Sequence, residues 1–169
     1  YRSVIYLFLF VYNCKNIKNI RFKMASIKEY LTNDHRRCDD IFASMEEKAN
    51  ESLSSAKDIT QEFIDATERH FQMEERVMFA EFEQKTGMTQ GPTAMMRQEH
   101  TQMRSLMQQM IDAIEADDKD KFFGLTETLM ILLQQHNMKE EQMLYTMAQQ
   151  HLSADADRIV DMMDSIVPE

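Results

Sequence analysis

From Ser26 onward, the hydrophobic positions recur in steps of three and four residues, which is the period of an α-helix. Three polar or turn-forming segments interrupt this pattern: SLSSAK, TGMTQGP and ADDKD. The pattern therefore predicts four long helices and a short final one. Short connections make consecutive helices antiparallel, so we predict an all-α, up-down-up-down four-helix bundle with a short C-terminal helix.

Capping residues mark the expected ends of these helices. Ser26 and Glu29 form a capping box before the first helix. Asp58 is expected to cap the second helix and Ser153 the last one, while Pro92 suits the first turn of the third. The other expected bounds are an end near Lys85 for the second helix and residues 121–150 for the fourth.

Each long helix carries one histidine in register with its hydrophobic stripe: His35, His70, His100 and His136. An imidazole in such a stripe needs a partner, because burying a polar group without one costs about 2 kcal/mol or more. Two of the histidines are followed four residues later by Glu74 and Glu140, on the same helix face. The period also turns Met143 and Met147 inward in the fourth helix, and Met162 in the last.

Four imidazoles and two carboxylates that meet inside a bundle can hold two metal ions. Histidine and carboxylate ligands suit iron, so we expect a carboxylate-bridged pair of iron ions. The expected metal ligands are His35, His70, Glu74, His100, His136 and Glu140. A purely structural bundle, or one that binds zinc or manganese, is the alternative.

Helix geometry also rejects neighbouring candidates. His151 lies about 16 Å further along the helix axis than the last of these ligands and is expected at the surface. Glu75 and Glu141 each lie five residues after a histidine, so they point about 140° away from it and are expected to be solvated. Cys38, one turn from the first histidine, is expected to be a small buried core residue.

Composition agrees with a single helical domain. The chain has 169 residues, of which 43% are hydrophobic, and three glycines leave little material for the turns of an all-β fold. The formal net charge of −10 argues against binding to nucleic acids or anionic membranes. Two cysteines, Cys14 and Cys38, provide no disulfide framework and favour a location in the reducing cytoplasm.

The first residues differ from the rest of the chain. The hydrophobic run from Val4 to Tyr12 is too short to cross a bilayer as a helix. Met24 begins a segment that is typical of the start of a protein. We therefore expect residues 1–23 to be an extension outside the functional domain, which spans residues 24–169.

Four segments together resemble the hemerythrin-like HHE cation-binding domain over about residues 26–150: DHRRCDDIF, HFQMEE, EHTQM and HNMKEEQMLY. The resemblance implies a left-twisted four-helix bundle with a non-haem di-iron centre, in which the four histidines are terminal ligands and Glu74 and Glu140 are bridges. Oxygen-carrying hemerythrins have a further histidine where this chain has Arg104. They also have an aspartate five residues after the last histidine, which leaves the choice between Glu140 and Glu141 open.

This variant with four histidines and two glutamates is similar to the repair-of-iron-centres proteins, which respond to nitric oxide and oxidants. We expect a protein that binds or senses dioxygen, nitric oxide or peroxide. The alternative is a stress protein that donates iron to damaged iron centres or reduces nitric oxide or peroxide. In that case its protein partner would be an electron donor or an iron acceptor. The sequence leaves open whether the protein is an enzyme.

Overall fold

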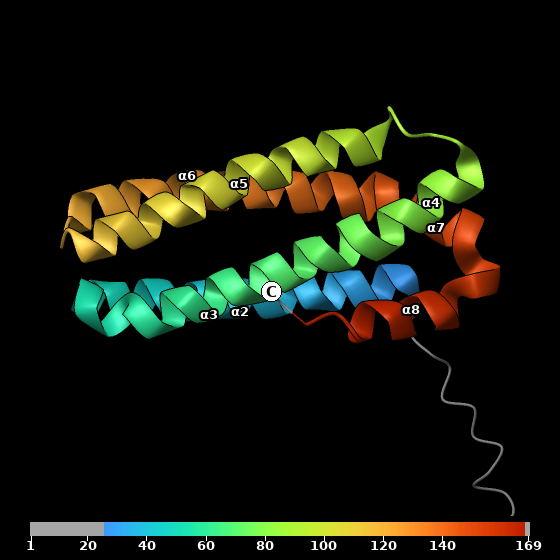
Figure 1. Cartoon of the computed structure of the whole chain (residues 1–169). Helices are drawn as coiled ribbons and strands as arrows, with labels where there is room; N and C mark the ends of the chain where they lie inside the picture. Colours follow the sequence, from blue (N-terminus) through green and yellow to red (C-terminus); the bar gives the residue numbers. More distant parts are fainter. Residues whose placement is uncertain (1–25, 168–169) are drawn as a thin grey trace, which may run out of the picture.

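The computed structural model describes residues 26–167, and the regular structure in this part is entirely helical. The predicted four-helix bundle with a short C-terminal helix is confirmed (Figure 1). The first two long stretches are α2 (Ile27–Glu51) and the series α3 (Leu53–Met73), π-helix η2 (Glu74–Met78) and α4 (Phe79–Thr86). The other two are α5 (Pro92–Glu115) and the series α6 (Lys119–Lys139), π-helix η3 (Glu140–Leu144) and α7 (Tyr145–Leu152).

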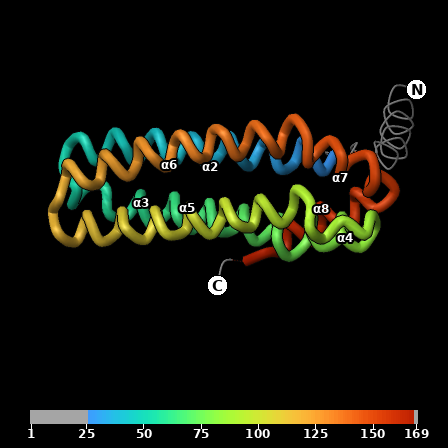
Figure 2. The backbone as a smooth tube through the Cα atoms, turned by 90° about the horizontal axis from the view of Figure 1, so that it is seen from above, coloured from blue at the N-terminus to red at the C-terminus, as the bar shows by residue number. Residues whose placement is uncertain are grey.

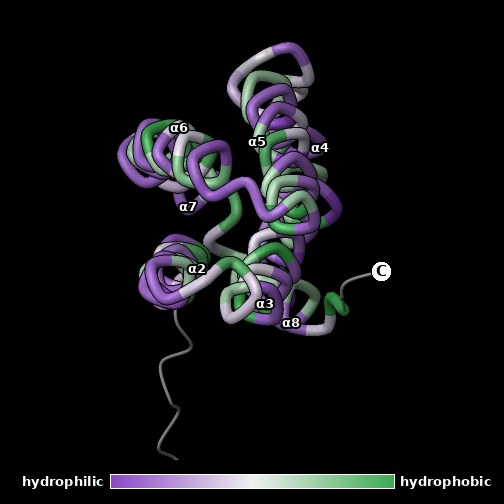
Figure 3. The backbone as a smooth tube through the Cα atoms, turned by 90° about the vertical axis from the view of Figure 1, so that its left-hand side faces the viewer, coloured by the Kyte–Doolittle hydropathy of each residue, from purple (hydrophilic) through white to green (hydrophobic). Residues whose placement is uncertain are grey.

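The bundle consists of two antiparallel helical hairpins that lie side by side. α2 pairs with α3 and α5 with α6, and both connecting turns lie at the same end of the bundle (Figure 2). Seen along their axes, the four stretches occupy four corners (Figure 3). After α7, a 3₁₀ turn, η4 (Ser153–Asp155), reverses the chain into α8 (Ala156–Asp164). α8 packs against α2 and η2, and it lies along the side of the bundle near the end that holds α4 and α7 (Figure 1). The expected extension over residues 1–23, with Cys14, lies outside the described residues.

The capping box at the start of α2 is confirmed. The Ser26 hydroxyl accepts from the Glu29 amide at 3.1 Å, and the Ser26 amide donates to the Glu29 carboxylate at 3.2 Å. The predicted cap at Asp58 is wrong, because the Ser52 hydroxyl accepts from the Ser55 amide and the helix begins earlier. The polar segment SLSSAK therefore forms the first turns of α3 and is not a linker.

The last predicted cap is also wrong. Ser153 lies in the 3₁₀ turn η4, and no side chain caps the start of α8 with a hydrogen bond. Other boundaries agree with the sequence: α5 begins at Pro92, and α4 ends at Thr86 where Gly87 adopts a left-handed conformation with φ 73°. The Asp118 side chain caps α6 by accepting from the Lys121 amide.

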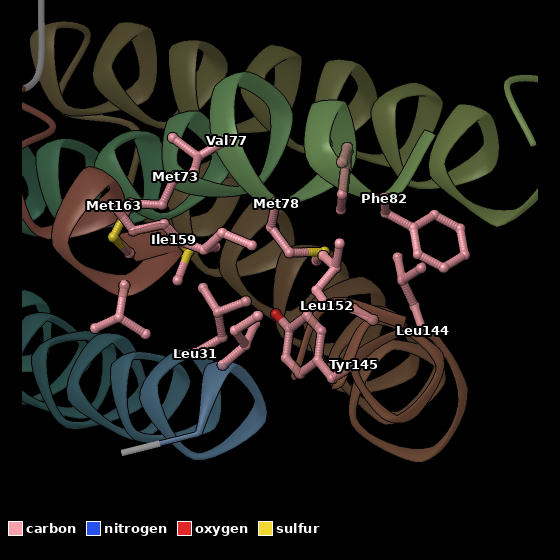
Figure 4. Packing of buried hydrophobic residues seen from close by; sticks show 14 of the residues in the cluster. Leu31, Met73, Val77, Met78, Phe82, Leu144, Tyr145, Leu152, Ile159 and Met163 are labelled. Carbon is pink, nitrogen blue, oxygen red and sulfur yellow. The ribbon is translucent and has the colours of Figure 1, made fainter. Parts of the chain in front are cut away.

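Two hydrophobic clusters fill the core, one on each side of a polar layer. The cluster nearer α8 contains Leu31, Val77, Phe82, Met96 and Leu144 (Figure 4). The cluster nearer the α2–α3 and α5–α6 turns contains Phe42, Phe63, Met107, Phe122 and Leu129. Along every long stretch, the histidine of the predicted ligand set lies between residues of these two clusters. The core therefore holds the polar layer from both sides.

The π-helix η3 changes which residues face this core. A π turn contains more residues than an α turn, so it shifts the positions that follow it around the helix axis. Met143 was expected inside but is 43% exposed, whereas Leu144 and Tyr145 are buried. Met162, also expected inside, is 38% exposed beside buried Met163. The constant α-helical period was thus wrong for Met143 because the helix is not α-helical there.

Among residues 26–167, no helix has both the length and the hydrophobicity needed to span a bilayer.

The shifted phase predicts opposite outcomes for two adjacent substitutions. Leu144→Ala should lower the free energy of unfolding by about 2–5 kcal/mol, because it leaves a cavity in the core. Met143→Ala should change it by less than about 0.5 kcal/mol, because Met143 is 43% exposed and lies outside the core. Urea denaturation of both variants without metal measures the difference. If Met143→Ala were the more costly substitution, this description of η3 would be wrong.

Candidate metal centre

Six buried side chains from all four helical stretches form the polar layer between the two hydrophobic clusters: His35, His70, Glu74, His100, His136 and Glu140. α2 and α5 each supply one histidine, His35 and His100. The other two stretches each supply a histidine followed by a glutamate that begins a π-helix. The structure thus brings together all six residues predicted from the sequence.

Donor atoms of this layer fall into two groups. In the first, His100 Nε2 lies 3.3 Å from Glu74 Oε2, and His136 Nε2 lies 3.2 Å from Glu140 Oε2. The two Nε2 atoms of this group are 3.1 Å apart. In the second, His35 Nε2 lies 3.3 Å from Glu140 Oε2, and the ring centroids of His35 and His70 are 4.5 Å apart. Glu140 belongs to both groups.

The donor set fits bound cations. Glu74 Oε2 and Glu140 Oε1 are buried and accept no hydrogen bond from the residues that the structure describes. Two buried carboxylates are costly unless positive charge compensates them. Imidazole nitrogen and carboxylate oxygen are also the donors that transition metals such as iron and zinc accept. The cluster is therefore able to hold metal.

The charges within the layer are strongly coupled even without metal. Burial acts to raise the pKa of Glu140, but the neighbouring imidazoles of His136 and His35 hold it well below its usual value. Burial lowers the pKa of His136, but Glu140 and Glu74 outweigh it and raise this pKa to about 9. Protons on the histidines thus compensate the carboxylates, and metal binding would displace those protons.

Each histidine is also held from behind by a carboxylate that contacts its Nδ1 atom. The four pairs are His35–Glu141 at 2.9 Å, His70–Asp34 at 2.9 Å, His100–Glu75 at 2.7 Å and His136–Glu99 at 2.9 Å. An ionised carboxylate can only accept, so each Nδ1–H donates, and in the neutral ring the Nε2 lone pair faces the layer. Such partners fix the ring orientation and increase the basicity of a metal-binding imidazole.

Cationic side chains in turn hold three of these carboxylates. Arg104 donates to Glu75 at 2.9 Å and 3.2 Å, and it also donates to Glu68. Arg37 donates one hydrogen bond to Asp34, and Lys139 donates one to Glu99. Burial opposes ionisation of Glu75, but its bonds to His100 and Arg104 lower its pKa to about 2. Arg104 therefore orients His100 through Glu75.

Two expectations for the neighbouring acidic residues were wrong. Glu75 and Glu141 are not simply solvated, because each points away from the histidine of its own helix toward a histidine of the adjacent helix. In the fourth helix, the two alternative carboxylates, Glu140 and Glu141, lie in different places. Glu140 has no exposed surface and lies in the layer, whereas Glu141 lies behind His35.

Other candidates lie outside the layer. His151 is exposed, as predicted, with its ring 6.0 Å from that of Phe82. Cys38 is partly buried and borders a small cavity beside His35 and His70. Burial raises the pKa of the Cys38 thiol to about 12, so the thiol stays protonated at neutral pH.

Tyr145 belongs to the layer and was missed from the sequence. Its hydroxyl donates to Glu74 Oε1 at 2.6 Å and lies 3.0 Å from Glu140 Oε2. Burial and these two carboxylates raise the pKa of Tyr145 well above its usual value. The α-helical period turns this position away from the layer, and only the π turn before it brings the phenol inside.

Comparison with known proteins gives one match. Residues 26–148 match the family model described as the hemerythrin HHE cation binding domain. The matched range includes all six residues of the predicted ligand set. No curated protein and no solved structure matches the chain.

The outer carboxylates should affect metal binding although they lie behind the histidines. Glu75→Ala removes the acceptor of the His100 Nδ1–H, and loss of such a partner typically costs about 10–100-fold in metal affinity. Glu68→Ala is the matched control, because Glu68 also pairs with Arg104 but contacts none of the four histidines. Competition with a chromophoric chelator measures both affinities. Equal affinities in the two variants would contradict this role for Glu75.

Proposed function

Because the chain belongs to the family of hemerythrin HHE cation-binding domains, we propose that its polar layer holds two iron ions and binds or senses a small ligand. The ligand would be dioxygen, nitric oxide or peroxide. The observation that carries the proposal is the buried set of four histidines and two glutamates, in two groups that share Glu140. The domain would span residues 24–169, since α8 contributes Ile159 and Met163 to the core.

The six side chains would divide between the two ions. His100 and His136 would bind one ion, and His35 and His70 the other. Glu74 and Glu140 would bridge them, because each carboxylate lies close to histidines of both groups. When bound, iron supplies interconvertible Fe(II) and Fe(III) states and open coordination positions for a small ligand.

The two halves of the layer differ in how they are enclosed. The ring of His100 stacks on Phe71 at 3.9 Å between centroids and faces Phe79 at 5.9 Å. His35 and His70 instead border a small cavity between α2, α3 and α6. A small ligand would therefore reach the layer on the side of His35 and His70.

A depression of about 290 Å³ between α2 and α6 would provide a route to this cavity. Its lining includes Phe42, Glu46 and Met130, and it shares Asp39 and Leu133 with the cavity. Most of the accessible wall of the cavity is apolar, from side chains such as Phe63 and Leu133, although polar side chains such as Asn137 also line it. An apolar wall admits a small uncharged molecule more readily than an ion. The protonated thiol of Cys38 offers no strong nucleophile there. This environment favours ligand binding over acid–base chemistry on a larger substrate.

Iron content tests the ligand assignment. His136→Ala should lower the number of irons per chain, because it removes an imidazole from the layer. His151→Ala should leave the number unchanged, because its ring lies outside. Elemental analysis after anaerobic loading measures both, with circular dichroism as a check on folding. If His151→Ala also lost iron, the assignment would be wrong.

The response to gases tests the function. Iron-loaded protein, reduced without oxygen and then exposed to dioxygen or nitric oxide, should change its visible spectrum and recover when the gas is removed. Leu133→Trp should slow this change several-fold, because the indole fills the route. Ile131→Trp is the matched control on the same helix, since Ile131 is 50% exposed.

Other outcomes would reject the binding proposal. Irreversible bleaching with release of iron would favour donation of iron to damaged centres. Steady consumption of the gas would favour an enzyme. A protein that binds no iron and gives no spectral change would contradict both the proposal and these alternatives.

A further inference from the structure

Tyr145, labelled in Figure 4 among the hydrophobic residues around it, brings a phenol oxygen into the polar layer beside the two glutamates. The side chain has no exposed surface. Its Oη atom lies 3.1 Å from His35 Nε2 and 3.4 Å from His70 Nε2. It also lies 2.6 Å from Glu74 Oε1 and 3.0 Å from Glu140 Oε2. Two imidazole nitrogens and two carboxylate oxygens, all of them possible metal ligands, therefore surround the phenol oxygen.

We propose that Tyr145 is a further ligand of the iron held by His35 and His70, bound through Oη as a phenolate. The proposal rests on the proposed function, because it needs iron at this position. On binding, an iron–oxygen bond forms, the O–H bond breaks, and the proton passes to solvent. No electron is transferred in this step.

The distances agree with a shared coordination sphere. Two ligands bound at about 2.1 Å to one ion, at right angles to each other, are separated by about 3 Å. The separations between Oη and the four nearest donor atoms range from 2.6 to 3.4 Å, on either side of this value. Glu141, by contrast, contacts His35 from the Nδ1 side, behind the ring.

The phenol also corrects an imbalance between the two ion positions. Glu74, His100, His136 and Glu140 converge on one position, whereas only His35, His70 and Glu140 converge on the other among the described histidine, cysteine and acidic residues. Tyr145 lies next to both histidines of the poorer group. It would add an oxygen ligand there to the two histidines and the bridging glutamates.

The backbone and the packing hold the phenol in this position. The Tyr145 amide donates to the Glu140 carbonyl across the π turn, so both side chains point into the layer. The phenol ring stacks on His35, with 5.5 Å between centroids and 27° between planes. Its other neighbours belong to the hydrophobic cluster nearer α8. Binding would therefore require little rearrangement of the side chain.

Tyr145 could instead act only as a hydrogen-bond donor that orients Glu74. Both roles make the residue important for stability and iron affinity, so neither measurement separates them. Only a phenolate bound to Fe(III) produces a visible charge-transfer band whose excitation enhances tyrosine ring vibrations in the resonance Raman spectrum. A hard anionic ligand also stabilises Fe(III) relative to Fe(II). If Tyr145 binds the iron, its removal should therefore raise the reduction potential of the iron.

The test uses the full chain loaded with Fe(III). Wild-type protein should show the charge-transfer band and the enhanced tyrosine vibrations, and growth on ring-deuterated tyrosine should shift those vibrations. Tyr145→Phe should lose both signals, keep two irons per chain and have a higher reduction potential. Tyr30→Phe is the matched control, because the Tyr30 hydroxyl bonds to Asp164 away from the layer. It should keep both signals.

The outcomes separate this proposal from the function on which it rests. Wild-type protein with two ferric ions but no deuterium-sensitive tyrosine vibrations would overturn the role of Tyr145 and leave the iron site standing. Signals that persist in Tyr145→Phe would overturn it too. Wild-type protein that binds no iron would overturn the proposed function and this ligand with it. The labelling experiment needs only wild-type protein, so it decides the question even if Tyr145→Phe does not fold.

Discussion

Burial of Glu74 and Glu140 is the constraint on which the rest of the bundle depends. Neither side chain has exposed surface, and an uncompensated buried charge costs several kcal/mol. Successive layers of side chains that alternate between basic and acidic groups compensate these charges. Four imidazoles surround the glutamates, carboxylates hold the imidazoles from behind, and side chains such as Arg104 and Lys139 hold the carboxylates nearer the surface. The hydrophobic clusters above and below keep water from replacing this network.

The two interruptions of the α-helical pattern begin at these same glutamates. Glu74 begins η2 and Glu140 begins η3, so both His-x-x-x-Glu segments lead into a π turn. π turns within α-helices often occur at functional sites, because they change the direction of a side chain without breaking the helix. In η3 the change brings the Tyr145 side chain to the same face of the helix as Glu140. The next residue of each π turn, Glu75 or Glu141, points across to a neighbouring helix and contacts the Nδ1 atom of a histidine there.

Much of this arrangement could be predicted because it depends on a simple period. The positions of His35, His70, His100 and His136 follow the hydrophobic stripes, and the capping box at Ser26 is a local signal. What could not be predicted depends on departures from that period or on other helices. Met143 is exposed and Tyr145 is buried because of a π turn, and this turn is not visible in the spacing of the hydrophobic residues. The Nδ1 partners were missed because each contact joins residues from different helices.

The polar layer is symmetric in its sequence motifs but not in its surroundings. On one side, Phe71 and Phe79 enclose His100, and Arg104 fixes its orientation through Glu75. On the other side, His35 and His70 lie beside a cavity, and Glu141, the Nδ1 partner of His35, is partly exposed. Under the proposed function, the enclosed half would hold its metal while the half beside the cavity admits the ligand. The asymmetry therefore comes from side chains other than the four histidines and two glutamates of the layer.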